Sequence, residues 1–239
     1  MHLGARYIDD PRAHEGRVCR FLKSISADAA ELFILGDALD YWYEYRHAVP
    51  RGHVRFFGAL AALADAGVKI TWITGNHDIW LFDYLRDEIG LEVVDAPMVP
   101  RRILGAEFVL AHGDRVGPQK PSFRFICRFF RNKVCQRLYS AIHPGLTIPF
   151  ATGWSRHSRK SGQAVCSDDF RLHLRGVLDA TRAEILARYP DTRYIVIGHH
   201  HCPTEEPLPG GGSFIVLGDW LRAGSYAVFD GRNLRLETF

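Results

Sequence analysis

The 239-residue sequence lacks any apolar run of the ~18–20 residues needed to cross a bilayer. Its first ten residues also lack a basic start followed by an apolar stretch, so we expect no signal peptide and a cytoplasmic protein. Disorder is excluded as the main state, because 47% of the residues are hydrophobic and the net charge is only +3. The length favours a single domain over residues 1–239.

Paired cysteines are missing as well. The chain has five cysteines, an odd number, and no C-x-x-C pair. A disulfide framework or a structural zinc site normally needs paired spacing. We therefore expect the cysteines to be reduced and structural.

Acidic residues are absent from residues 115–167, which contain 10 of the 30 Lys and Arg. The remaining 20 basic and 27 acidic residues give the rest of the chain a net charge of −7, so this segment stands out as a basic block. Such a block indicates an anionic partner: nucleic acid, a membrane surface or a phosphorylated substrate.

Within the block, apolar residues recur at three- and four-residue steps over residues 122–142, which predicts one amphipathic helix. Two interpretations stay open. The helix lies on the surface with its apolar side against the core, or its phenylalanines face a lipid. Nucleic acid ranks lowest as a partner, because the aromatic residues follow a helical stripe and do not form a flat stacking platform.

Short apolar runs bounded by turn residues predict buried strands at residues 31–35, 68–74, 107–111 and 193–197. Helical periodicity lies between them, at residues 11–25, 53–66 and 168–188. This alternation favours an α/β architecture. Three further runs near the end of the sequence predict antiparallel strands at residues 213–217, 226–229 and 234–237.

Polar clusters with metal-ligand side chains follow the four predicted strands: Gly36-Asp37, Gly75-Asn76-His77-Asp78, His112-Gly113-Asp114 and Gly198-His199-His200-His201. Strand ends along one edge of a sheet converge, so these side chains can meet in one cleft. Nitrogen and oxygen ligands without thiolate suit Mn, Fe, Zn or Co. Two such ions can hold a hydroxide for in-line attack on phosphorus. We therefore predict a dinuclear phosphoesterase, in which His77 faces the reacting group and Asp78 fixes the tautomer of His77.

As a set, the four clusters resemble the signature of the calcineurin-like metallophosphoesterases. The resemblance implies an α/β fold, a sandwich of two β-sheets flanked by helices. It also implies two divalent metal ions, with manganese expected and Fe, Zn or Co as alternatives. By this resemblance Asp37 bridges both metals, and His77 stabilises or protonates the reacting phosphate. The remaining ligands divide into Asn76, His112 and His199 at one site and His2 and His201 at the other.

The flanking residues are similar to the UDP-2,3-diacylglucosamine hydrolase branch, notably residues 2–5, 40–45, 75–81, 143–144 and 218–220. That branch cleaves the pyrophosphate of a nucleotide-linked glycolipid to UMP and 2,3-diacylglucosamine 1-phosphate during lipid A synthesis. The resemblance implies that residues 115–167 form a helical lid insertion that holds acyl chains. It also implies a peripheral position at the inner membrane surface. Candidate phosphate contacts are Ser158, Arg159 and Lys160, with a solvated loop as the alternative.

One motif departs from the family. Its first motif is Asp-x-His at the end of a first strand, whereas His2 is preceded only by Met1. We expect Met1 to be an internal residue of a longer reading frame that carries the missing strand and aspartate. Two alternatives stay open. One is a metallophosphoesterase acting on another nucleotide or phospholipid, and the other is a catalytically impaired binding module.

Overall fold

The structure, a computed structural model, describes residues 1–160, 166 and 168–239, except for the side chains of residues 152, 154–160, 168 and 173. The chain divides into two compact units. The first comprises Met1–Asp95 and Phe125–Gln163, and the second comprises Ala96–Arg124 and Ala164–Phe239. Each unit contains its own β-sheet, and both combine strands with helices, so the predicted α/β class is confirmed.

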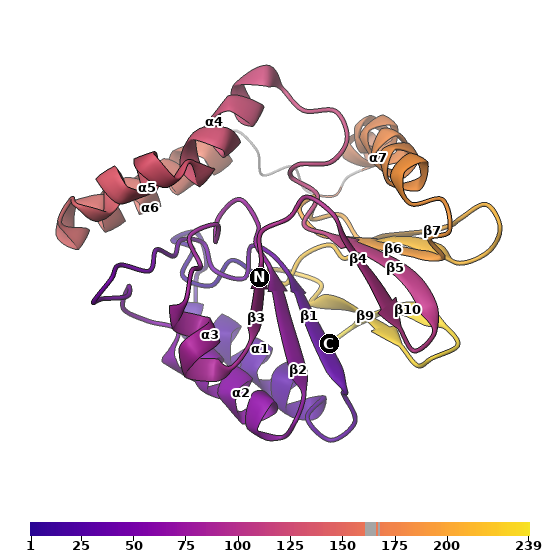
Figure 1. The fold of residues 1–239 in the computed structure, drawn as a ribbon, viewed down its shortest axis with the longest axis horizontal. Helices are drawn as coiled ribbons and strands as arrows, with labels where there is room; N and C mark the ends of the chain where they lie inside the picture. The colour runs from indigo at the N-terminus through magenta and orange to yellow at the C-terminus, as the bar shows by residue number, and fades with distance from the viewer. Residues whose placement is uncertain (161–165, 167) are drawn as a thin grey trace. The chain divides into compact units, whose positions relative to one another are not determined.

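The first unit is built on a three-stranded parallel sheet in the order β1-β2-β3 (Figure 1). The strands are β1 (Glu31–Leu35), β2 (Lys69–Ile73) and β3 (Glu92–Val94). Because the strands are parallel, their carboxyl ends lie at one edge. The clusters that begin at Gly36 and Gly75 therefore leave the sheet at the same edge.

Three helices accompany this sheet: α1 (Pro11–Ser24), α2 (Val54–Asp65) and α3 (Tyr84–Ile89). Helix α1 begins where the sequence predicts it, because the Asp10 side chain accepts a hydrogen bond from the Ala13 amide and proline occupies the first helical position. The ring of Phe56 in α2 meets Trp72 of β2 edge to face, and both side chains are fully buried. This contact packs α2 onto the sheet.

The second unit has a five-stranded mixed sheet in the order β4-β5-β6-β8-β7. Its strands are β4 (Val99–Ile103), β5 (Ala106–Ala111), β6 (Tyr194–Ile197), β7 (Thr204–Pro207) and β8 (Ser213–Val216). Helix α7 (Asp168–Arg188) contributes Leu174, Leu178 and Ile185 to the same buried cluster as the central strands. A two-stranded antiparallel pair, β9 (Ser225–Phe229) and β10 (Leu234–Thr238), follows.

The basic block forms helices between residues 121 and 160, but the single helix predicted over residues 122–142 is wrong. The structure has α4 (Pro121–Arg131), α5 (Lys133–Ser140) and α6 (Pro144–Lys160). The break falls at Asn132, whose extended backbone places its side chain where it accepts hydrogen bonds from the amides of Val134 and Cys135. A local cap therefore ends the first helix after three turns, although the apolar periodicity of the sequence continues past it.

Two further expectations are corrected. Strand β8 is parallel to β6, and only its other neighbour, β7, is antiparallel to it. Cys166 and Cys202 form a disulfide, whereas we expected reduced cysteines. The fold brings together two residues that lie 36 positions apart in the sequence, and no spacing rule could have shown that pairing.

Candidate metal centre

Asp37 and His2 come together at the end of β1. The amide of His2 donates to the backbone oxygen of Asp37 at 2.8 Å, so the two backbones run side by side. The His2 Nε2 atom then lies 3.7 Å from Asp37 Oδ2. Both side chains are almost fully buried, with 1% and 7% of their surface exposed. A buried imidazole facing a buried carboxylate fits two ligands of a cation.

The backbone at the predicted ligands adopts a conformation that L-residues rarely take. His2, Asp37, His199 and His201 all have left-handed φ angles, between 52° and 64°. Such conformations cost about 1–3 kcal/mol each and concentrate at functional sites. Four of the six predicted metal ligands thus lie on strained backbone.

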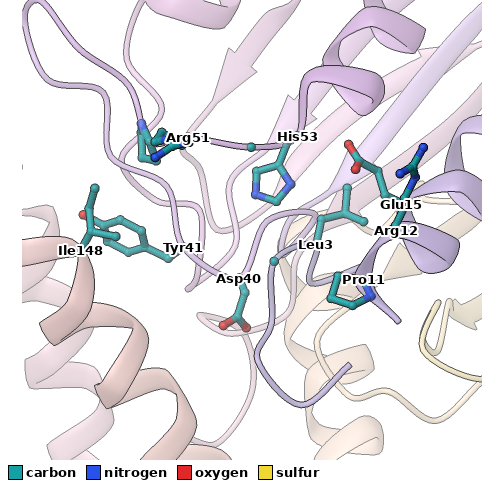
Figure 2. A pocket seen from close by; sticks show the side chains of 12 residues that line it. Leu3, Pro11, Arg12, Glu15, Asp40, Tyr41, Arg51, His53 and Ile148 are labelled. Carbon is teal, nitrogen blue, oxygen red and sulfur yellow. The ribbon is translucent and has the colours of Figure 1, made fainter. Parts of the chain in front are cut away.

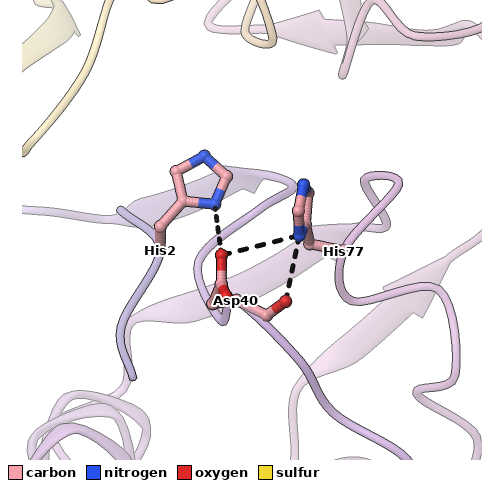
Figure 3. Close-up of side chains that lie close together, drawn as sticks. All are labelled: His2, Asp40 and His77. Atoms are coloured by element: carbon pink, nitrogen blue, oxygen red, sulfur yellow. Dashed lines mark hydrogen bonds and ion pairs between the residues drawn. The ribbon is translucent and has the colours of Figure 1, made fainter. Parts of the chain in front are cut away.

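A second carboxylate joins the first unit's histidines. Figure 3 shows Asp40 between His2 and His77. Its Oδ1 atom lies 3.6 Å from the Nδ1 atoms of both rings. The backbone oxygen of Asp40 lies 2.9 Å from His77 Nδ1. His77 Nδ1 is therefore the proton donor to this oxygen, which leaves Nε2 on the far side of the ring for a reacting group.

Asp78 holds the backbone of this region. One oxygen of its carboxylate accepts a hydrogen bond from the Gly75 amide at 2.7 Å. The other accepts from the Ala38 amide at 2.9 Å and from Trp72 Nε1 at 3.2 Å. Asp78 therefore ties the loop after β2 to the loop after β1, while the partner that faces Nδ1 of His77 is Asp40.

In the second unit, β5, β6 and β8 are mutually parallel, so the residues after them lie at one edge of the sheet. The His199 Nδ1 and His112 Nε2 atoms are 3.2 Å apart, close enough to bind one cation. His201 Nδ1 lies 4.0 Å from Asp219 Oδ2. Burial, with a smaller contribution from His112, lowers the pKa of His200 to about 4, so its ring is neutral at pH 7.

These residues fit divalent cations. Donor atoms of His2, Asp40 and His77 lie within 4.8 Å of one another, and none of the donors in either unit is a thiolate. Imidazole nitrogens and carboxylate oxygens of this kind suit Mn, Fe, Zn or Co. The predicted ligand Asn76 lies half-buried between Gly75 and His77 in the loop after β2.

Helices of the basic block are attached to the loops that carry these residues. The Tyr41 hydroxyl lies 3.0 Å from the hydroxyl of Tyr139 in α5, and burial raises the pKa of the Tyr41 hydroxyl. Trp80 Nε1 donates to the backbone oxygen of Phe130 at 2.9 Å. Arg131 donates to the backbone oxygen of Gly75 at 3.1 Å. The end of α4 therefore lies directly against the Gly75–Asp78 loop.

Sequence reasoning missed two of these residues. Asp40 stands three residues after Asp37, and that short spacing is the signal that could have singled it out. Arg131 was counted only as one charge of the basic block. The side chains of Ser158, Arg159 and Lys160, at the end of α6, lie outside the part of the chain that the structure describes.

Comparison with known proteins agrees with this geometry. The calcineurin-like phosphoesterase family model matches residues 13–203. The UDP-2,3-diacylglucosamine hydrolase of Porphyromonas gingivalis is 38% identical over 99% of this chain and 94% of its own. The enzymes of that name from Aeromonas hydrophila and Pseudomonas aeruginosa are 27% and 29% identical over 99% and 100% of this chain, and over 95% and 96% of their own. The predicted family is confirmed: the chain belongs to the calcineurin-like phosphoesterases, a family of metal-dependent hydrolases.

Proposed function

We propose that this protein hydrolyses the pyrophosphate bond of UDP-2,3-diacylglucosamine to UMP and 2,3-diacylglucosamine 1-phosphate, a step of lipid A biosynthesis. The observation that carries the proposal is the match to the Porphyromonas gingivalis enzyme, which is 38% identical over 99% of the chain. The match therefore extends through the basic block, residues 115–167, and is not confined to the family motifs. Both the phosphoesterase site and the segment next to it support the same substrate.

The proposed metal ligands are Asp37, His2 and Asn76 in the first unit, and His112, His199 and His201 in the second. Two divalent cations, when bound there, activate a water molecule and neutralise charge on the phosphate oxygens. We propose manganese as the native ion, because the set offers imidazole, carboxylate and amide donors without sulfur.

His77 is proposed to contact the reacting phosphate through Nε2. Its Nδ1 atom donates to the backbone oxygen of Asp40 at 2.9 Å, which fixes the ring orientation. Asp40 Oδ1 lies 3.6 Å from the same nitrogen, so both polar groups of Asp40 face one edge of the ring. Asp78 acts through the backbone, because its carboxylate holds the amides of Gly75 and Ala38.

Residues 115–167 are proposed to form the lid that receives the acyl chains, within a single functional domain of residues 1–239. Its helices expose large apolar side chains at Phe125, Phe129, Leu138, Leu146 and Phe150, each at least half exposed. Three basic residues lie between them on the surface: Arg128, Lys133 and Arg137. Ser158, Arg159 and Lys160 are proposed as contacts to the substrate phosphates.

The same surface supports a peripheral position at the inner face of the cytoplasmic membrane. No helix in the described part of the chain is both long enough and apolar enough to cross a bilayer. Apolar side chains interleaved with basic ones bind the interface of anionic lipids, where burial and charge attraction add together. A substrate with two fatty chains would then reach the site without leaving the membrane surface.

The function is tested by measuring UMP release from UDP-2,3-diacylglucosamine with Mn²⁺ and with EDTA, beside hydrolysis of bis-p-nitrophenyl phosphate. We expect Mn²⁺-dependent turnover of the lipid. His77→Asn should lower it on the order of a hundredfold, as expected for a proton donor. His47→Asn, at an exposed histidine outside the site, is the matched control. Turnover of the generic ester but not of the lipid would point to another phosphodiester, and no turnover of either would favour a binding module.

The membrane surface is tested by sedimentation with vesicles of phosphatidylglycerol and phosphatidylethanolamine. Phe129→Ser should reduce the bound fraction, because it removes an apolar side chain that is half exposed on α4. Leu172→Ser, at a leucine of α7 that is even more exposed, is the control. Equal binding by both variants would contradict this part of the proposal.

A further inference from the structure

A cavity of about 390 Å³ lies within the first unit, beside the His2–Asp40–His77 cluster. Figure 2 shows its walls, which come from the segment before α1, the first two turns of α1, the loop between β1 and α2, and one residue of α6, Ile148. Asp40 lines it, so the cavity and the candidate metal centre share a residue.

Two arginines line the cavity, Arg12 from α1 and Arg51 from the loop before α2. Both side chains are exposed, and neither has an ion-pair partner among the residues that the structure describes. Arginine whose donors are not engaged binds planar groups, by stacking and by donating hydrogen bonds to carbonyl or phosphate oxygens. The cavity therefore offers cationic donors that the fold itself leaves unused.

His53 adds a polar group of a different kind. Burial lowers the pKa of His53, with Glu15 acting in the opposite direction, so the ring is neutral at pH 7. A neutral imidazole offers one hydrogen-bond donor and one acceptor. The ring is held closely, because a Cβ atom at Gly4 would lie only 3.0 Å from it. Its backbone is left-handed, with φ at 59°, as at the predicted metal ligands.

Most of the remaining lining residues are apolar. Tyr41, Pro11 and Pro50 carry rings, and Leu3 and Ile148 are aliphatic. Flat aromatic and guanidinium surfaces are typical of sites that bind a nucleobase, where stacking and edge hydrogen bonds act together. Acyl chains would need a longer wall without charges, whereas two arginines, a glutamate and an aspartate line this one. The volume fits one ring system with its ribose.

We propose that this cavity binds the nucleoside end of the substrate, a pyrimidine base with its ribose. This inference rests on the proposed function, since a UDP-linked substrate supplies the nucleoside. Arg12 and Arg51 donate to the carbonyl oxygens of the base or to the ribose, and His53 accepts from the base N–H or donates to a carbonyl oxygen of the base. With the nucleoside there, the phosphate attached to it lies toward Asp40 and the metal centre.

The test is isothermal titration of the Mn²⁺-loaded protein with UMP and, separately, with glucosamine 1-phosphate, which represents the other end of the substrate. Arg12→Glu and Arg51→Glu should each raise the Kd of UMP about tenfold, the effect of losing a charge-assisted hydrogen bond. Both should leave the Kd of glucosamine 1-phosphate within about twofold. Arg46→Glu makes the same charge change at an exposed arginine outside the cavity, and should change neither.

Uridine, which has no phosphate, tests binding of the nucleoside alone. With the Mg²⁺-loaded protein, saturation-transfer NMR should show transfer to the uracil protons in wild type and Arg46→Glu, and weaker transfer in Arg51→Glu. Unchanged UMP affinity in both cavity variants would overturn the inference, as would a selective loss of glucosamine 1-phosphate binding. These outcomes are separate from turnover. If the protein hydrolyses the lipid but the cavity variants bind UMP like the wild type, the inference about the cavity is refuted and the proposed function stands. If UMP binding depends on the arginines but the lipid is not hydrolysed, the proposed function is refuted and the inference about the cavity stands.

Discussion

Gly75 touches the predicted bridging ligand so closely that no side chain fits at this position. A Cβ atom at Gly75 would lie 2.2 Å from Asp37 Oδ1, 2.6 Å from the Asp37 amide nitrogen and 2.9 Å from Cγ. Favourable contacts between such atoms begin near ~3.5 Å, so Gly75→Ala requires a shift of about 1 Å. Rotation of the Asp37 side chain cannot relieve the overlap, because one of the three atoms belongs to the backbone.

We expect Gly75→Ala to lower the free energy of unfolding by about 3 kcal/mol, near the upper end for overpacking a buried site. The shift should also break the 2.9 Å hydrogen bond from the His77 amide to Asp37 Oδ1 and displace that carboxylate. Displacing a ligand or its support lowers metal affinity about 10–100-fold. Urea denaturation of the metal-free protein measures the first effect, and calorimetric Mn²⁺ titration measures the second.

Gly58→Ala is the matched control. Gly58 lies inside α2 on an exposed face, and a Cβ atom there would meet nothing within 4 Å. This variant should stabilise the protein by about 0.5–1 kcal/mol, because alanine loses less backbone entropy in a helix. The reasoning is refuted if Gly75→Ala changes stability by less than about 1 kcal/mol and binds Mn²⁺ like the wild type.

Three other predictions concern groups near the site. Asp40→Ala should lower kcat about 10–100-fold, since Asp40 orients His2 and His77. Asp40→Asn should lower kcat by a smaller factor. Unchanged steady-state rates would contradict this role. Glu44→Ala should lower the free energy of unfolding, measured by urea denaturation, by about 3 kcal/mol. The reason is that this buried carboxylate accepts hydrogen bonds from three amides at the start of α3. Glu44→Gln should lower it by less. The pKa of His53 is lower in the folded state than its usual 6.5, so the free energy of unfolding should fall as the pH drops below that value. His53→Gln should flatten this pH dependence. An identical pH profile in wild type and variant would contradict the prediction.

Local pattern in the sequence predicted the parts of the fold that local forces determine. Strand β1 coincides with the predicted run at residues 31–35, because a short apolar run with turn residues after it has few alternatives. Helix α1 begins at Pro11, where an Asp cap and a proline stand next to each other. The ligand motifs were visible for the same reason, since each follows directly on a strand. The break at Asn132 was also local, but the apolar periodicity concealed it.

Only the tertiary structure decided which residues meet across long separations. Asp40 faces His77 from 37 positions away, and Tyr41 reaches Tyr139 across 98. The cavity at Arg12, Arg51 and His53 likewise draws on separate segments. Periodicity carries no information about such pairs, because they depend on how packed elements place their loops. The sequence alone thus predicted the family, seven of the ten strands in the described part of the chain and the motifs that carry the proposed ligands. Packing decided that Asp40 orients His77 and that the helices of the basic block rest on the loop of Gly75.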